Sequence, residues 1–331
     1  MLINWKTGLL GAALAAILIG NANGVASAAD KPTIGFTSLG FFVPALAEAR
    51  DGALAKAEEL GAKIEYITAD DPPTQQTAVE NLLAKKVDVL AIDPNDSQAI
   101  SEAVKLANKA NVPVVMWVGS AKSGDVASTI VSDEKQGGYD IAHWLFEKLG
   151  GKGKVALLQG AKAHQAGALR EEGFRQALSE FPNIELVDYA EAQWARDVGE
   201  RAASNMLTKT PDLNAIVALN DEMAHGAIAA AESRDLKNIL ITGYNGQCDA
   251  IKAVLDGTMA ATLYQPFRDI GAKVVEVAVD VAAGKTVDNH INMPAIVLDK
   301  ALAEQVASGT VANASAGLIA SVKRAVSGCP K

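Results

Sequence analysis

The sequence predicts an α/β protein whose sheets are mostly parallel and covered by helices on both faces. Short β-branched runs alternate with longer stretches in which apolar residues recur at helical spacing, and this alternation is typical of parallel sheets. Strands are predicted at Thr33–Phe36, Ile64–Thr68, Val87–Ile92, Val112–Val118, Lys154–Leu158, Ile184–Tyr189, Ala215–Leu219 and Ile239–Thr242.

The helices between these runs are predicted from the same periodicity. Ala45 to Leu60 places its apolar side chains on one helical face, and Gly61 closes it as a C-terminal residue should. Ile100 to Ala110 repeats the pattern. The tail from about Asp299 to Val326 is rich in alanine and also predicts helix.

Two irregularities in the alternation predict a second domain. A turn-rich segment, Ser120–Asp125, and a short run, Ser128–Ser132, precede a helix that begins near Glu134. Further on, the apolar run Ala260–Tyr264 meets Gln265 and a proline before a new helix. Since no Gly-, Ser- or Pro-rich linker separates the halves, we expect direct crossings about which two domains hinge.

The first 28 residues predict export. Lys6 precedes an uncharged apolar run, Gly8–Gly20, and the small-residue triplet Ala26–Ala28 follows it, which is the layout of a secretory leader cut after the triplet. The apolar run is too short to span a membrane, although an uncleaved anchor is the alternative. The residue directly after the predicted cut is Ala29 and not a cysteine, so we expect no lipid anchor.

The composition limits the classes of partner. Removing 28 of the 331 residues leaves 303, enough for two domains, and the net charge of −9 without a basic cluster argues against nucleic acid and anionic membrane. The two cysteines, Cys248 and Cys329, predict a disulfide bridge in an oxidising compartment. The alternative is two unpaired thiols.

No sequence motif of an enzyme is present. The chain has no Gly-x-Ser-x-Gly and no His-Glu-x-x-His, and Gly284–Thr286 fails as a phosphate loop because Val279 replaces its first glycine. The cluster Gly150–Gly153 precedes a strand, so it predicts a turn after a helix. The four histidines lack ligand spacing. We therefore expect neither catalysis, nor a cofactor, nor a bound metal.

The residues that follow the predicted strands suggest a ligand site instead, because ligands of open α/β sheets bind at the carboxyl ends of the strands. Aromatic rings cover the apolar faces of a sugar, whereas amides and guanidinium groups bind its hydroxyls, each of which costs about 1–3 kcal/mol when buried unpaired. The candidates are Phe41, Phe42, Asp93, Arg170, Trp194, Asn220, Asn245 and Gln265.

Several of these residues lie in segments by which the chain resembles the periplasmic sugar-binding proteins of the ribose-binding type, the solute receptors of ABC importers. The resemblance runs from about Lys31 to Leu298 and depends on the order and spacing of several pieces. These are Gly-Phe-Phe-Val near Phe41, Ile92–Ser97, Ala110–Val114, Leu158–Gly160, Arg170–Phe174 and Asn220–Ala224.

The resemblance implies two Rossmann-like lobes joined by three crossings, near Ser132-Asp133, near Gln265-Pro266 and after about Pro294. The N-terminal lobe would comprise residues 29–132 plus 266–294, and the C-terminal lobe residues 133–265 plus 295–331. It further implies that Phe41 and Phe42 flank the ligand, that Trp194 stacks on it, and that Arg170, Asn220 and Gln265 bind its hydroxyls.

Two departures from the family pattern make ribose itself doubtful. Val118-Gly119 stands where the family has an Asp-Arg pair, and Asn245 stands where it has a carboxylate. If Arg170 has lost its carboxylate neighbours, it could accept a sugar acid, unless Asp93 supplies the balancing charge.

The function implied is capture of a small sugar or polyol in the periplasm and its delivery to an ABC permease, with closure of the lobes on the ligand. The alternatives are presentation to a chemoreceptor or sensor kinase, and binding of a non-sugar or anionic solute. A transcriptional regulator on this fold would need a helix-turn-helix where this chain has its leader.

Overall fold

The computed structural model describes residues 31–311 and 315–328. The predicted leader and Cys329 lie outside the described residues, so the cleavage after Ala28 and the bridge from Cys248 to Cys329 stay predictions. None of the described helices combines the length and apolarity needed to cross a membrane.

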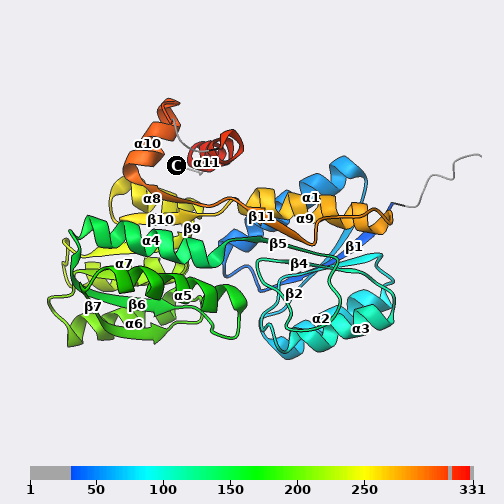
Figure 1. Ribbon diagram of the computed structural model, residues 1–331, viewed down its shortest axis with the longest axis horizontal. Helices are drawn as coiled ribbons and strands as arrows, with labels where there is room; N and C mark the ends of the chain where they lie inside the picture. The colour runs from blue at the N-terminus through cyan, green and yellow to red at the C-terminus, as the bar shows by residue number, and fades with distance from the viewer. Residues whose placement is uncertain (1–30, 312–314, 329–331) are drawn as a thin grey trace, which may run out of the picture. The chain divides into compact units, whose positions relative to one another are not determined.

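The first of two six-stranded sheets is entirely parallel, in the order β11-β5-β4-β3-β1-β2. Helices α1 and α9 pack together on one face, with α2 and α3 on the other (Figure 1). The strands are β1 (Thr33–Ser38), β2 (Lys63–Thr68), β3 (Val89–Ile92), β4 (Val114–Trp117), β5 (Ser128–Ser132) and β11 (His290–Met293). The helices are α1 (Pro44–Leu60), α2 (Pro72–Ala84), α3 (Ile100–Lys109) and α9 (Phe267–Ala282).

The second sheet has the order β12-β10-β9-β8-β6-β7 and is parallel except for β12, which pairs with β10 in the antiparallel sense. Helices α4 and α5 pack as one pair and α6 and α7 as another. The strands are β6 (Lys152–Gln159), β7 (Asn183–Glu191), β8 (Ala215–Ala218), β9 (Leu240–Asn245), β10 (Ala261–Tyr264) and β12 (Ile296–Asp299). The helices are α4 (Glu134–Lys148), α5 (Gln165–Glu180), α6 (Arg196–Lys209), α7 (Asp221–Glu232), α8 (Cys248–Asp256), α10 (Lys300–Ser308) and α11 (Ala316–Gly328).

These sheets confirm the predicted two-lobe α/β fold. The chain changes sheet between β5 and α4, between β10 and α9, and between β11 and β12, which supports the three predicted crossings. The bounds of the two lobes stay a prediction. We call the lobe built on the first sheet the N-terminal lobe and the other the C-terminal lobe.

The sequence did not predict β11 and β12. Each has four residues, too few to display an alternation, and β11 is an edge strand whose side chains are exposed or half-buried. The helical tail is confirmed by α10 and α11, and the Asp299 side chain caps α10 by accepting a hydrogen bond from the Leu302 amide.

Candidate functional site

A cleft between the two sheets is lined from both lobes. Its residues follow the carboxyl ends of strands or begin the next helices, where parallel sheets place ligands. The N-terminal lobe contributes Leu39, Val43, Leu46, Asp93, Val118 and Phe267, and the C-terminal lobe contributes His164, Ala166, Arg170, Trp194, Asn220 and Asn245. The free volume is only about 40 Å³.

Arg170 is the centre of the C-terminal wall. Its Nε donates to Glu134 Oε2 at 2.7 Å, and its NH1 donates to the Leu219 carbonyl at 2.8 Å. Arg170 and Glu134 are both about 97% buried. Burial lowers the pKa of Arg170, but the charge and hydrogen bond of Glu134, together with Tyr244 and Asp221, outweigh burial and raise that pKa. The guanidinium therefore stays charged and has a bonded counter-ion.

Glu134 also organises the groups around it. Tyr244 donates its hydroxyl to Oε2 at 2.8 Å, and Gln265 donates its amide to Oε1 at 2.9 Å. The Arg170 guanidinium lies 3.8 Å from the centre of the Tyr244 ring. The condition for sugar-acid binding, an arginine without a carboxylate neighbour, is thus not met, because Glu134 supplies that carboxylate.

Two glycines allow α4 and α5 to bring this pair together. A Cβ on Gly138 would lie 2.2 Å from the Arg170 carbonyl oxygen, and one on Gly173 would lie 1.9 Å from the Lys135 carbonyl oxygen. Only glycine permits such an approach of two helix backbones. Arg170 on α5 is thereby placed beside Glu134 at the start of α4.

Asn220 caps a helix and holds the neighbouring loop. Its side chain accepts from the Met223 amide at 2.9 Å, which caps α7, and its Nδ2 donates to the Trp194 carbonyl at 2.9 Å. Asn220 lines the cleft as well. It therefore ties the loop of Trp194 to the start of a helix.

Asn245 and Gln265 both support Arg170. Asn245 accepts from Arg170 NH1 and Gln265 accepts from NH2, each at 3.3 Å. Asn245 lines the cleft, whereas Gln265 lies behind it, between Arg170 and Glu134. Asn245 Nδ2 has no partner among the described residues, so it is a donor available to a ligand.

Trp194 lies in the cleft wall with its backbone in the left-handed region, at φ 63°. Its ring centre is 5.5 Å from the Arg170 guanidinium and 5.9 Å from the His164 ring, which it meets edge-on. A Cβ on Gly160 would fall within 2.1 Å of the indole, so the ring lies against bare backbone. This packing fixes the orientation of the indole.

Asp93 and His164 connect the two walls. His164 Nδ1 accepts from the Ala166 amide at 3.1 Å, so a neutral ring carries its proton on Nε2, which lies 3.2 Å from Asp93 Oδ1. Burial raises the pKa of Asp93, and the bond from His164 opposes that rise. Nearby, the Ala45 amide of the N-terminal lobe donates to Gln247 Oε1 of the C-terminal lobe at 3.1 Å.

Phe41 and Phe42 do not line the cleft in this conformation. Phe41 packs against Tyr66 at 5.6 Å between ring centres, and the Arg50 guanidinium lies 4.6 Å from its ring. Phe42 is 46% exposed and borders a separate depression with Arg196 and other residues of the C-terminal lobe. Their predicted contact with a ligand stays a prediction, as do the binding roles of the other six candidates.

The sequence reasoning missed Glu134 and discounted His164. Glu134 follows the first predicted crossing directly, and that position was the available signal. His164 lies on a loop that follows a strand, as do several of the candidates. Because the four histidines lack metal-ligand spacing, the sequence predicted that it is structural. Its pairing with Asp93 could not be inferred from a separation of 71 residues.

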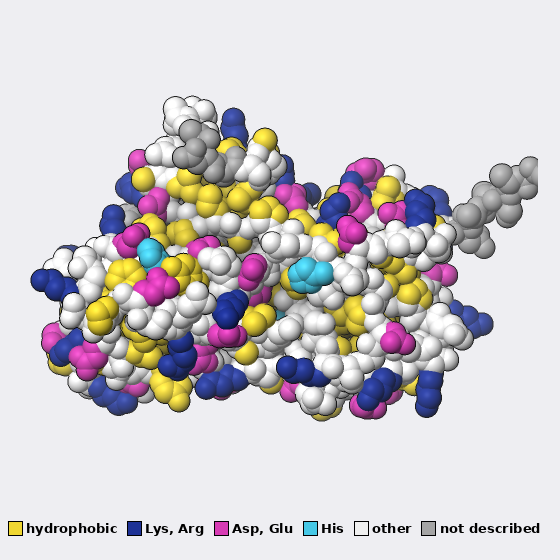
Figure 2. All heavy atoms as spheres, viewed as in Figure 1, with side chains coloured by type: hydrophobic (Ala, Val, Ile, Leu, Met, Phe, Trp, Pro, Cys, Tyr) yellow, Lys and Arg dark blue, Asp and Glu magenta, His cyan; other side chains and the backbone are white. Residues whose placement is uncertain are grey.

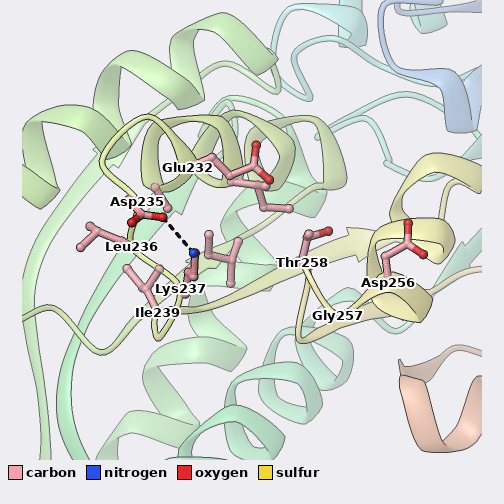
Figure 3. A pocket seen from close by; sticks show the side chains of 11 residues that line it. Glu232, Asp235, Leu236, Lys237, Ile239, Asp256, Gly257 and Thr258 are labelled. Carbon is pink, nitrogen blue, oxygen red and sulfur yellow. Dashed lines mark ion pairs between the residues drawn. The ribbon is translucent and has the colours of Figure 1, made fainter.

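A larger cavity, of about 450 Å³, lies elsewhere in the C-terminal lobe (Figure 3). It is bounded by the end of α7, the loop after it and the turn before β10, and Lys237 pairs with Asp235 at 3.1 Å at its rim. This region lies at the amino ends of β9 and β10, and most of its charged side chains are exposed. We assign the site to the cleft because that is the carboxyl end of both sheets.

Comparison with known proteins decides the family. A sequence profile described as the periplasmic binding protein domain matches residues 34–286. The chain belongs to the periplasmic binding protein family. The ribose import binding protein of Salmonella typhimurium is 36% identical over 263 residues, which are 79% of this chain and 88% of that protein. Its counterpart in Haemophilus influenzae is 35% identical over 85% of this chain and 96% of its own length.

Solved structures of this family share the fold. A periplasmic solute-binding protein of an ABC transporter from Actinobacillus succinogenes, with bound D-allose, has a TM-score of 0.77 at 30% identity and is matched over 83% of this chain and 99% of its own. A solute-binding protein from Bacillus halodurans with bound myo-inositol has a TM-score of 0.77 at 26% identity, over 85% and 97% of the two chains. The predicted resemblance to ribose-binding-type proteins is thus confirmed.

Proposed function

We propose that the protein captures a neutral sugar or polyol in the periplasm and delivers it to the permease of an ABC importer. The observation that carries the proposal is the C-terminal wall, where Trp194 offers a flat ring beside Arg170 and Asn245 in a buried cleft. The names of the relatives, which are import binding proteins, support it. So do sugar and polyol ligands in related structures.

The charges support binding of a neutral ligand without chemistry. Glu134 neutralises Arg170, and Asp93 accepts from His164, so no unpaired cation is left for an anionic solute. Blue and magenta side chains are interspersed over the face seen in Figure 2, which gives no basic groove there for nucleic acid. We further propose that the lobes hinge between open and closed forms, and that the leader is cleaved.

A thermal-shift screen of ligand-free protein against pentoses, hexoses, polyols and sugar acids tests the proposal. A one-site ligand at 1,000 times its Kd adds about 4 kcal/mol to the free energy of unfolding. We expect a clear rise in Tm with neutral sugars or polyols of related stereochemistry. Trp194→Ala should abolish most of that rise, whereas Tyr189→Ala, an aromatic on the same lobe that is 52% exposed and outside the cleft, should retain it.

A rise with sugar acids but not with their neutral parents would contradict the proposed neutral ligand. No rise with any sugar or polyol would contradict the proposed function.

A further inference from the structure

The two walls of the cleft differ in chemistry. Four of the six lining residues of the C-terminal lobe are polar, whereas the N-terminal lobe offers hydrocarbon from Leu39, Val43, Leu46, Val118 and Phe267. The polar residue of that wall, Asp93, already accepts from His164 through Oδ1. Among the described residues its Oδ2 has no partner, so Asp93 is the side chain of this wall that can accept from a ligand hydroxyl.

Val118, in the middle of the apolar wall, has an unusual backbone. Its φ is 59°, and the Gly119 amide donates to the Trp117 carbonyl at 2.7 Å, which makes a γ-turn with Val118 at its centre. A β-branched residue is strained at positive φ, whereas glycine or asparagine adopts it readily. Strain of this kind gathers at ligand sites. Trp194 and Asn245, at φ 63° and 112°, line the same cleft.

No polar side chain can replace Val118 from the next position. A Cβ on Gly119 would lie 2.9 Å from Pro94 Cγ and 3.3 Å from His164 Cε1. Pro94 and His164 therefore occupy the space that the Cβ of an arginine at position 119 would need. At the carboxyl end of β4 the ligand meets the isopropyl group of Val118.

We propose that Val118 is a specificity-determining residue, and that the cleft selects a neutral sugar or polyol that turns a deoxy or methyl position toward the N-terminal lobe. This inference rests on the proposed function. A hydroxyl placed against this wall would lose its water without gaining a partner. A methyl or methylene group would instead pack against the isopropyl group.

The test compares matched deoxy and hydroxylated sugars by titration calorimetry on ligand-free protein. The pairs are D-fucose and D-galactose, L-rhamnose and L-mannose, and 2-deoxy-D-ribose and D-ribose. In at least one pair the deoxy member should bind about 10–100 times more tightly. Val118→Asn, which tolerates the backbone and adds an amide, should shift that ratio at least about 10-fold toward the hydroxylated member.

Lys86→Asn is the matched control. Lys86 has the same φ of 59° but is exposed in the turn before β3, outside the cleft. Lys86→Asn should keep or raise Tm because it relieves backbone strain, whereas in Val118→Asn that relief is offset by the loss of buried apolar packing. Only Val118→Asn should change the affinity ratio. If Val118→Asn does not fold, Val118→Gly removes the isopropyl group in the same conformation and serves in its place.

Three outcomes are decisive. Tighter binding of the hydroxylated member in every pair would overturn the proposal, and so would an affinity ratio that the Val118 variants leave unchanged. Binding of no sugar or polyol at all would overturn the proposed function itself, and this inference with it. The two failures can be told apart, because a protein that binds no sugar or polyol gives no affinity ratio, whereas a failure of this inference alone requires measured ratios.

Discussion

The two walls of the cleft are built by different means. In the C-terminal wall, Arg170, Glu134, Gln265 and Asn245 hold one another through buried hydrogen bonds, so their donors and acceptors are fixed before a ligand arrives. In the N-terminal wall, buried hydrogen bonds of Gln75 and Asn95 to the backbone hold the turn of Asp93. The surface of that wall is mostly apolar and includes a strained valine. We therefore expect the C-terminal wall to select the hydroxyl pattern of a ligand and the N-terminal wall to select its shape.

The difference also bears on opening of the cleft. The lobes meet through bonds such as Asp93 to His164 and Ala45 to Gln247, and through apolar contact around Leu46. In the proposed opening these bonds would break, and the hydrocarbon of the N-terminal wall would be exposed to water. A ligand that replaces that contact with its own apolar edge favours the closed form.

The largest effect should come from breaking the Arg170–Glu134 pair. Arg170→Met leaves Glu134 buried without its counter-ion, and we expect the free energy of unfolding to fall by about 3–5 kcal/mol in urea titrations. Adding Glu134→Gln should recover part of the loss, because the buried charge is then gone.

Arg175→Met is the matched control for the Arg170–Glu134 cycle. Arg175 lies on the same helix and pairs with Glu171, but it is exposed, and its loss should cost about 0–1 kcal/mol. If the changes in the free energy of unfolding caused by Arg170→Met and by Glu134→Gln simply add in the double variant, the C-terminal wall is not a coupled network.

The C-terminal wall was more accessible to sequence reasoning than the N-terminal one. Arg170, Trp194, Asn220 and Asn245 follow or flank strand ends, and that rule brought them into one cleft. The strand-end rule did not select Glu134, because Glu134 starts a helix and lies 36 residues before Arg170 in the sequence.

The features of the N-terminal wall depend on tertiary structure. The positive φ of Val118 results from a γ-turn that no local residue preference favours, so the sequence showed only the departure from the family pattern. Phe41 and Phe42 were expected at the ligand, yet adjacent residues of a loop point differently, and Phe41 packs on Tyr66. The edge strands β11 and β12 were too short to be recognised.

A second prediction tests how far the orientation of Trp194 defines the C-terminal wall. Gly160→Ala places a methyl group against the indole, and the packed turn and ring have little room to move. We therefore expect the free energy of unfolding to fall by about 1–3 kcal/mol. Ligand affinity, measured by calorimetry, should fall about 10-fold. Gly317→Ala, on α11 with open space around it, should hold or raise stability and leave the affinity unchanged. Equal affinities for the two variants would contradict the role of the indole.

The smallest effect concerns a carboxyl of the N-terminal lobe that borders a different cavity. Glu48 on α1 makes no ion pair among the described residues, and burial raises its pKa to about 7, against the opposing charge of Arg268. The folded protein therefore holds a proton that the unfolded chain releases between pH 4.5 and 7, so stability should fall as pH rises through this window. After allowing for its partial exposure, the fall is about 1–2 kcal/mol.

Glu48→Gln should reduce this slope in urea titrations at pH 5, 6, 7 and 8, whereas Glu58→Gln, exposed on the same helix, should keep it. Buried Asp221, whose pKa burial also raises to about 7, contributes a slope of the same sign in both variants. A slope that survives Glu48→Gln unchanged would mean that Glu48 stays ionised in the folded protein. A reduced slope would show that this carboxyl of the N-terminal lobe is held protonated, whereas Glu134 of the C-terminal lobe has a bonded cation in Arg170.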